Sequence, residues 1–332
     1  MAATQPKSNW IITPFVDLSC LSLGWLAFFF IPYYFADHSE TFRLLAVTTF
    51  AAHRYFTFPL IYLDPVEFQR RKAIYLLTPV LCLAIVGLCY YFRIDEPEMF
   101  AIWYLFNYFH FVRQKYGILR IYSGKARWGH KRLDAWTSYL WGIAGFAFMF
   151  GYQSDVEGRV MHYLRTLSGG TPIPMEMTWL AYLFASLITC VWLAYEFLNP
   201  EQKNWPKLIF LFSVVFMYGV VPILSTDALF IATSFSHAAE YIALVGFTVK
   251  NKSRQHAFES PVLARAARHI LLSTAGFIIA TSGMLYGLKT LSLLAFLVFT
   301  YGTSFMHFIF DGMIWKLRRP RVAQEVGVAV PG

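Results

Sequence analysis

About ten apolar segments follow one another along this chain, and they constrain its fold more than any other feature. Each has roughly 20 residues, the length that an α-helix needs to cross the hydrocarbon core of a bilayer. They lie near Phe15–Ala36, Phe42–Leu63, Ala73–Phe92, Met99–Ile118, Ala135–Tyr152, Met177–Phe197, Leu208–Leu224, Ala228–Val249, Ala267–Leu288 and Leu291–Trp315. Only 14% of the residues are charged, against about 25% in a typical soluble domain. We therefore predict an all-α, polytopic membrane bundle of about ten transmembrane helices.

Basic residues are concentrated in the connections that follow every second segment. The triplet Arg70-Arg71-Lys72 and the stretch 113–132 are examples, whereas the connections 37–40 and 95–98 are short and acidic. Because cytoplasmic loops carry the excess of Lys and Arg, both termini are predicted to be cytoplasmic. The net charge of +9 is thus explained by topology, and we expect no nucleic-acid partner. The expected location is a multi-pass position in the bacterial inner membrane.

The chain shows no sign of a second folded domain. We predict a single transmembrane helical domain over residues 1–319. The remaining residues, 320–332, are predicted to form a disordered cytoplasmic tail.

Four of the nine histidines lie inside the predicted spans rather than in loops or at helix ends. They are His53, His110, His237 and His307. Each is 8 to 12 residues from the cytoplasmic end of its span, which places all four at a depth of roughly 12–18 Å. Gln114, Glu240 and Asp311 lie one turn nearer the cytoplasm. Polar groups in hydrocarbon are costly, so this layer is expected to face the bundle interior.

Imidazole nitrogens combined with carboxylate oxygens suit iron, zinc or manganese, and no thiolate lies in the layer. Non-haem iron is the expected cofactor, with zinc or manganese as alternatives. The predicted metal ligands are His53, His110, His237, His307, Asp311 and Glu240. The predicted catalytic residues are Glu240, Tyr241 and Gln114, which would orient the imidazoles or donate hydrogen bonds beside the metal. The alternative is that each histidine makes a separate interhelical hydrogen bond.

Such a layer favours a membrane-bound, metal-dependent oxygenase, hydroxylase or desaturase. Its partners would be a lipid-soluble substrate, O2 and an unidentified electron donor. The alternative from another class is a proton-coupled transporter that uses the same His, Asp and Glu residues as a relay. A haem protein ranks below both, since two stacked haems need histidine pairs at two depths.

The arrangement resembles the integral-membrane histidine enzymes, above all the Brp/Blh family of carotene-cleaving dioxygenases. The resemblance covers scattered positions and matches at His53, His110 and His237. It departs at Tyr241, where that family would be expected to supply a second histidine. The resemblance implies histidine-bound iron and a retinal-forming activity.

Overall fold

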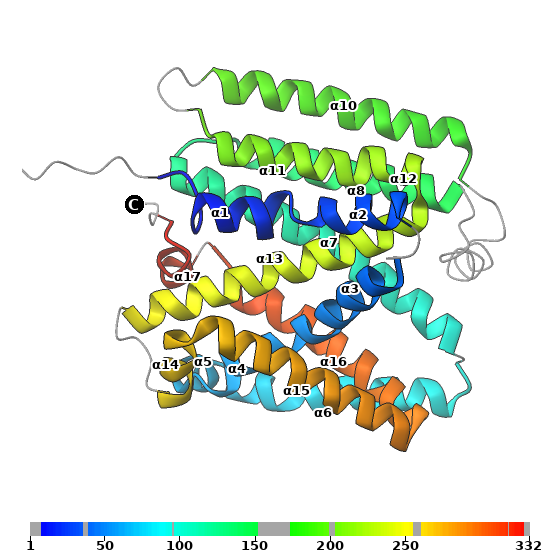
Figure 1. The fold of residues 1–332 in the computed structure, drawn as a ribbon, viewed down its shortest axis with the longest axis vertical. Coiled ribbons are helices and arrows are strands. Elements are labelled where there is room, and N and C mark those ends of the chain that lie inside the picture. The colour runs from blue at the N-terminus through cyan, green and yellow to red at the C-terminus, as the bar shows by residue number, and fades with distance from the viewer. Residues whose placement is uncertain are drawn as a thin grey trace, which may run out of the picture.

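The computed structural model of the chain describes residues 8–35, 39–94, 96–151, 173–198, 203–254, 260–317 and 319–328. Within these ranges every regular element is helical and no strand occurs, which confirms the predicted all-α class (Figure 1).

The first half of the chain forms helices α1 to α8. Their bounds are α1 Pro14–Val16, α2 Trp25–Tyr34, α3 Ser39–His53, α4 Thr57–Tyr62, α5 Pro65–Arg70, α6 Lys72–Tyr91, α7 Glu96–Ala126 and α8 Lys131–Gly151. The second half forms α10 Met175–Phe197, α11 Trp205–Val215, α12 Val221–Leu224, α13 Thr226–Arg254, α14 Pro261–Arg268, α15 Ile270–Leu291, α16 Leu293–Ile314 and α17 Pro320–Glu325. Short π-helical turns join α1 to α2 and α11 to α12.

Six helices in the described residues are long and apolar enough to cross a membrane, and a seventh span results if the bent pair Pro14–Ser22 and Trp25–Tyr34 counts as one. The six are Lys72–Tyr91, Met175–Phe197, Trp205–Leu224, Leu229–Arg254, Ile270–Leu291 and Leu293–Ile314. A membrane protein is therefore supported, but ten spans are not. The predicted spans over 42–63, 99–118 and 135–152 are missing from the six. The first of them is interrupted by a 3₁₀ turn at Arg54–Phe56.

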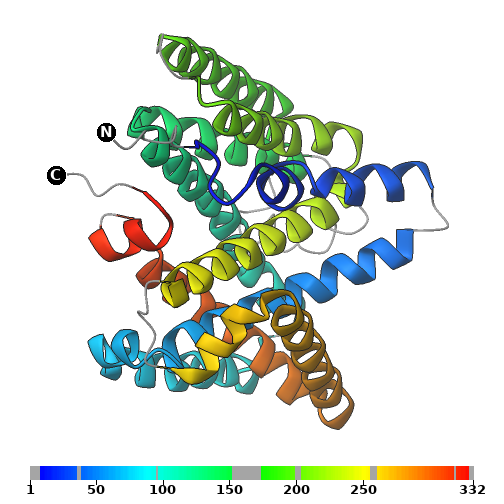
Figure 2. The ribbon, with the colours of Figure 1, turned by 60° about the vertical axis from the view of Figure 1, so that its left-hand side comes forward.

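Helix α13 is the centre of the bundle. It runs between a group containing α8, α10 and α11 and a second group containing α6, α15 and α16 (Figures 1 and 2). In the apolar stretch of α13, 61% of the residues are buried, whereas in the apolar stretch of α15 only 11% are buried. The outer helix α15 instead exposes large side chains such as Leu271 and Ile279, as a lipid-facing helix does. Residues on α13 are therefore the best placed to meet side chains from both groups.

The break between α3 and α4 has a local cause. Pro59 lies in the first turn of α4 and has no N–H to donate to the carbonyl of Tyr55. The helix tightens into the 3₁₀ turn Arg54–Phe56, and His53 becomes the last residue of α3. The break thus falls beside a predicted ligand.

A buried carboxylate ties together one end of the bundle. Asp134, on α8, accepts from Arg120 at 2.6 Å, from Trp192 at 2.8 Å and from Lys207 at 2.9 Å. These partners come from α7, α10 and α11. Because every charge in the cluster has a partner, its role is structural.

The predicted disordered tail is corrected by the structure as far as residue 328. Residues Pro320–Glu325 form α17, which buries Val322, Ala323 and Val326. Its Arg321 lies 3.2 Å from Glu67, and its Glu325 lies 3.3 Å from Lys252. These basic and acidic side chains thus pair with charges on the bundle instead of with water. Residues 329–332 lie outside the described part of the chain.

We expect truncation after Arg319 to destabilise the protein, because it exposes the surface under α17 and leaves Lys252 with one acid fewer. The melting temperature in detergent should fall by on the order of 5 °C. Truncation after Val328 is the matched control and should leave it unchanged. Equal melting temperatures for the two truncated proteins would show that α17 does not dock.

Candidate metal centre

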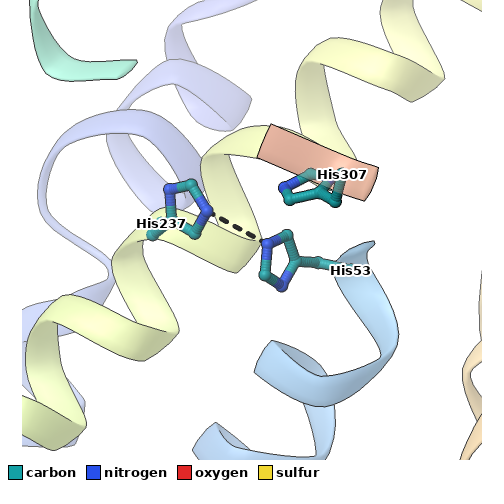
Figure 3. Close-up of side chains that lie close together, drawn as sticks. All are labelled: His53, His237 and His307. Atoms are coloured by element: carbon teal, nitrogen blue, oxygen red, sulfur yellow. Dashed lines mark hydrogen bonds between the residues drawn. The ribbon is translucent and has the colours of Figure 1, made fainter. Parts of the chain in front are cut away.

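The four intramembrane histidines come together from four helices. His53 ends α3, His110 lies in α7, His237 in α13 and His307 in α16. Their ring centroids form a closed circuit with the distances His53–His237 4.6 Å, His237–His110 4.9 Å, His110–His307 5.0 Å and His307–His53 4.9 Å. Figure 3 shows three of these rings turned toward one another. The predicted histidine layer is therefore a single cluster.

Two overlapping sets of side chains in the described residues have the spacing of a metal site. The first consists of His53, His237 and His307, and the second of His110, His307 and Asp311. Within each set the ligand atoms lie within 4.8 Å of one another. His307 belongs to both sets, so they describe one centre with five protein donors rather than two separate sites.

The ring nitrogens have the hydrogen-bonding pattern of metal ligands. His53 uses Nδ1 to contact the carbonyl oxygen of Phe50, and His307 places Nδ1 2.8 Å from the hydroxyl of Thr57. A ligand histidine commonly binds such a partner through the nitrogen that does not face the metal, which fixes its tautomer and orientation. The Nε2 atoms of both rings are left to face the cluster.

Several nitrogens in this buried cluster lack a hydrogen-bond partner. His110 Nε2, His237 Nδ1 and His307 Nε2 have none among the described residues, and His53 Nε2 faces His237 Nε2 at 3.0 Å (Figure 3). Buried polar atoms are rarely left unpaired, so each exception needs an explanation. A metal ion among the imidazoles would provide it for the Nε2 atoms of His110 and His307, and the donor set therefore fits a metal.

Asp311 is held by one oxygen and offers the other. Its Oδ1 accepts from Tyr241 at 2.8 Å and from Thr57 at 3.1 Å. Its Oδ2 lies 3.5 Å from His307 Nε2 and 3.7 Å from His110 Nε2. Tyr241 thus stands beside the centre, where it positions a carboxylate.

Thr57 has no role in the sequence-based prediction, yet it connects three residues of the site. Its hydroxyl lies 2.6 Å from Tyr241, in addition to its contacts with His307 and Asp311. The sequence contains one signal for it, the spacing of four residues from His53. That spacing alone does not distinguish a site residue from an ordinary helix-packing threonine.

Glu240, a predicted ligand, has both carboxylate oxygens in contact with other side chains. One carboxylate oxygen pairs with Lys115 and accepts from Ser236, while the other accepts from Gln114 at 2.9 Å. Glu240 is absent from both ligand sets. Lys115 is only 2% exposed, so its ammonium is buried together with this carboxylate.

Gln114 contacts the backbone of a ligand residue rather than its imidazole ring. Its side-chain amide donates to the carbonyl oxygen of His237 at 3.0 Å as well as to Glu240. These contacts join α7 to α13 beside a ligand. Gln114 touches no ligand nitrogen, so the contacts give it a positioning role.

Aromatic rings enclose the centre. Phe111 lies 4.3 Å from the ring of His237, Phe308 lies 4.9 Å from His110, and Phe50 stacks on His53 at 5.0 Å between centroids. Among the four imidazoles, His110 is the one classed as only partly buried, with 12% of its side chain exposed. The centre is therefore buried among aromatic rings, and its most open side is at His110.

Glu240→Gln should lower the free energy of unfolding by about 3 kcal/mol, because it leaves the buried Lys115 ammonium without its carboxylate. Combining it with Lys115→Met removes both charges and should restore most of the loss. The double variant should also keep its metal, as measured by elemental analysis. Loss of metal from a well-folded double variant would return Glu240 to the ligand set.

Comparison with known protein families, with curated proteins and with solved structures yields no match for this chain. The resemblance to carotene-cleaving dioxygenases therefore stays a prediction.

Proposed function

We propose that this chain is a membrane-embedded, metal-dependent oxidoreductase, and specifically a non-haem iron oxygenase, hydroxylase or desaturase. The observation that carries the proposal is the meeting of four imidazoles and Asp311 in a buried interior, with three ring nitrogens unpaired. Sets of histidine and carboxylate ligands that leave coordination positions open are typical of non-haem iron enzymes that use O2. Zinc and manganese accept the same donors and are the alternatives.

The ligands would be His53, His237 and His307, completed by His110 and Asp311. Iron held there supplies the capacity to activate O2. The chain's own groups do the rest: Thr57 and Tyr241 hold the Asp311 carboxylate in place, and the surrounding Phe side chains exclude water.

A lipid-soluble substrate follows from the surroundings of the centre. The bundle is lined by aromatic rings, and its outer helices expose Leu and Ile. A substrate that reaches His110 from the bilayer would meet an apolar environment at every step. O2 partitions into the same environment, and an electron donor would have to act from the membrane surface.

We further propose ten membrane crossings with both termini in the cytoplasm of a bacterial cell, as the charge distribution favours. Two of the segments beyond the six clear spans contribute ligands to the site, since His53 ends α3 and His110 lies in α7. Helix α7 includes Asn107, His110, Gln114 and Lys115, so the hydropathy of that crossing is low for a functional reason.

Purified protein should contain one metal ion per chain. His307→Ala should lose it, since His307 belongs to both ligand sets. The control is His269→Ala, an exposed histidine at the end of α14, which should keep it. Elemental analysis of the two purified variants makes the comparison. Equal metal contents would contradict the assigned centre.

The transporter alternative predicts a different outcome. It requires proton-coupled uptake of a solute into liposomes by metal-free protein. A relay also needs a continuous series of hydrogen bonds, whereas three ring nitrogens of the cluster have no partner in the described residues. The geometry therefore favours the metal enzyme.

A further inference from the structure

Arg54 is a buried cation without a counterion. It directly follows His53 and is 6% exposed. Its Nε donates to the carbonyl oxygen of Ala51 at 3.0 Å, and its Nη1 donates to the carbonyl oxygen of Thr300 at 2.9 Å and to the hydroxyl of Ser304. All three acceptors are neutral. No carboxylate lies within 4.0 Å of the guanidinium among the described residues.

The other buried cations of the described chain differ from it in this respect. Lys115 pairs with Glu240, Lys207 with Asp134 and Glu196, and Lys252 with Asp64 and Glu325. Those pairs balance their charges within the fold. Arg54 does not, although it lies in the same apolar bundle.

A guanidinium keeps its proton under all ordinary conditions, so Arg54 cannot reduce the energetic cost of its burial by becoming neutral. An isolated charge in a low-dielectric interior is expensive. The proposed metal centre increases the imbalance, since a divalent ion with Asp311 as its one carboxylate retains a net positive charge. The bundle therefore requires an anion that the described chain does not supply.

The guanidinium also has hydrogen-bond donors to spare. Arginine carries five N–H groups, and three of them are used by Ala51, Thr300 and Ser304. The two on Nη2 have no acceptor in the described chain. A carboxylate is the group whose geometry best matches such a donor edge. Phe50 and Tyr55 flank the guanidinium carbon at 6.0 and 5.8 Å from their ring centroids, and these apolar surroundings suit a carboxylate that is attached to an apolar molecule.

Arg54 lies near the centre, so an anion bound to it would also lie near the centre. Its acceptors Ser304 and Thr300 precede His307 by three and seven residues on α16, which is about 5 and 10 Å along the helix axis. A carboxylate bound there would lie within about two to three helical turns of His307 along α16.

We propose that Arg54 binds the carboxylate of a long-chain, lipid-soluble acid, and that this acid is the substrate, presented to the centre near its carboxyl end. The claim that the acid is the substrate rests on the proposed function. The claim that Arg54 binds its carboxylate does not. A neutral hydrocarbon such as a carotene would leave the charge of Arg54 unbalanced, so the two substrate classes are distinguishable.

The test compares binding of palmitic acid and methyl palmitate to the full-length protein in nanodiscs of zwitterionic lipid, at a pH at which the acid is ionised. Wild type should bind the acid about tenfold or more tightly than the ester, as one charge-assisted hydrogen bond allows. Arg54→Gln should abolish this ratio, and Arg54→Lys should keep part of it. The control Arg268→Gln, which removes an exposed arginine at the end of α14, should leave it unchanged.

Equal affinities of wild type for acid and ester would overturn the proposal, whether or not the Arg54 variants fold. An unchanged ratio in folded Arg54→Gln would also overturn it. Competition with sodium acetate distinguishes a long-chain acid from a small soluble anion as the ligand of Arg54. Displacement of palmitic acid by equimolar acetate would indicate that the site binds small free anions, and would overturn the proposal. Metal content is measured on the same samples. Selective acid binding by metal-free protein would refute the metal enzyme and retain the Arg54 site.

Discussion

Polar side chains in an apolar bundle must find partners. In this protein that requirement bears most heavily on the ring of four imidazoles. Each ring comes from a different helix, and two of the rings are fixed by a further contact, His53 with Phe50 and His307 with Thr57. These outer contacts leave nitrogens of the cluster without protein partners. The break after His53 and the central position of α13 both serve to bring the rings together.

Buried charges in the described chain are of two kinds. Lys115 with Glu240 and Lys207 with Asp134 are internally balanced, and such pairs fix how neighbouring helices meet. Arg54 has no carboxylate within 4.0 Å in the described chain, and three ring nitrogens of the imidazole cluster have no hydrogen-bond partner there. A charge or lone pair that the fold leaves unsatisfied at some cost in stability indicates a ligand. This difference separates the structural polar groups of the bundle from those we assign to function.

Much of the site could be predicted because the spacing of residues within one helix is regular. His307 and Asp311 are four residues apart and do share a face, and all four histidines meet as their depths indicate. The contacts of Glu240 differ from the predicted ones for a complementary reason. Its spacing from His237 is also compatible with the centre, but Lys115 approaches from another helix and takes its carboxylate. The tail was misjudged in the same way, since the partners of Arg321 and Glu325 lie far away in sequence.

The amino-acid sequence by itself determined an all-helical membrane protein with four histidines at one depth, because hydropathy and helical periodicity are properties of single segments. Only the tertiary structure decided which atoms meet across helices. It assigned Thr57 to the centre, paired Glu240 with Lys115 and left Arg54 without a counterion. The physical reason is that the energy of a buried polar group depends on the partners around it, and those partners come from helices that the sequence does not place relative to one another.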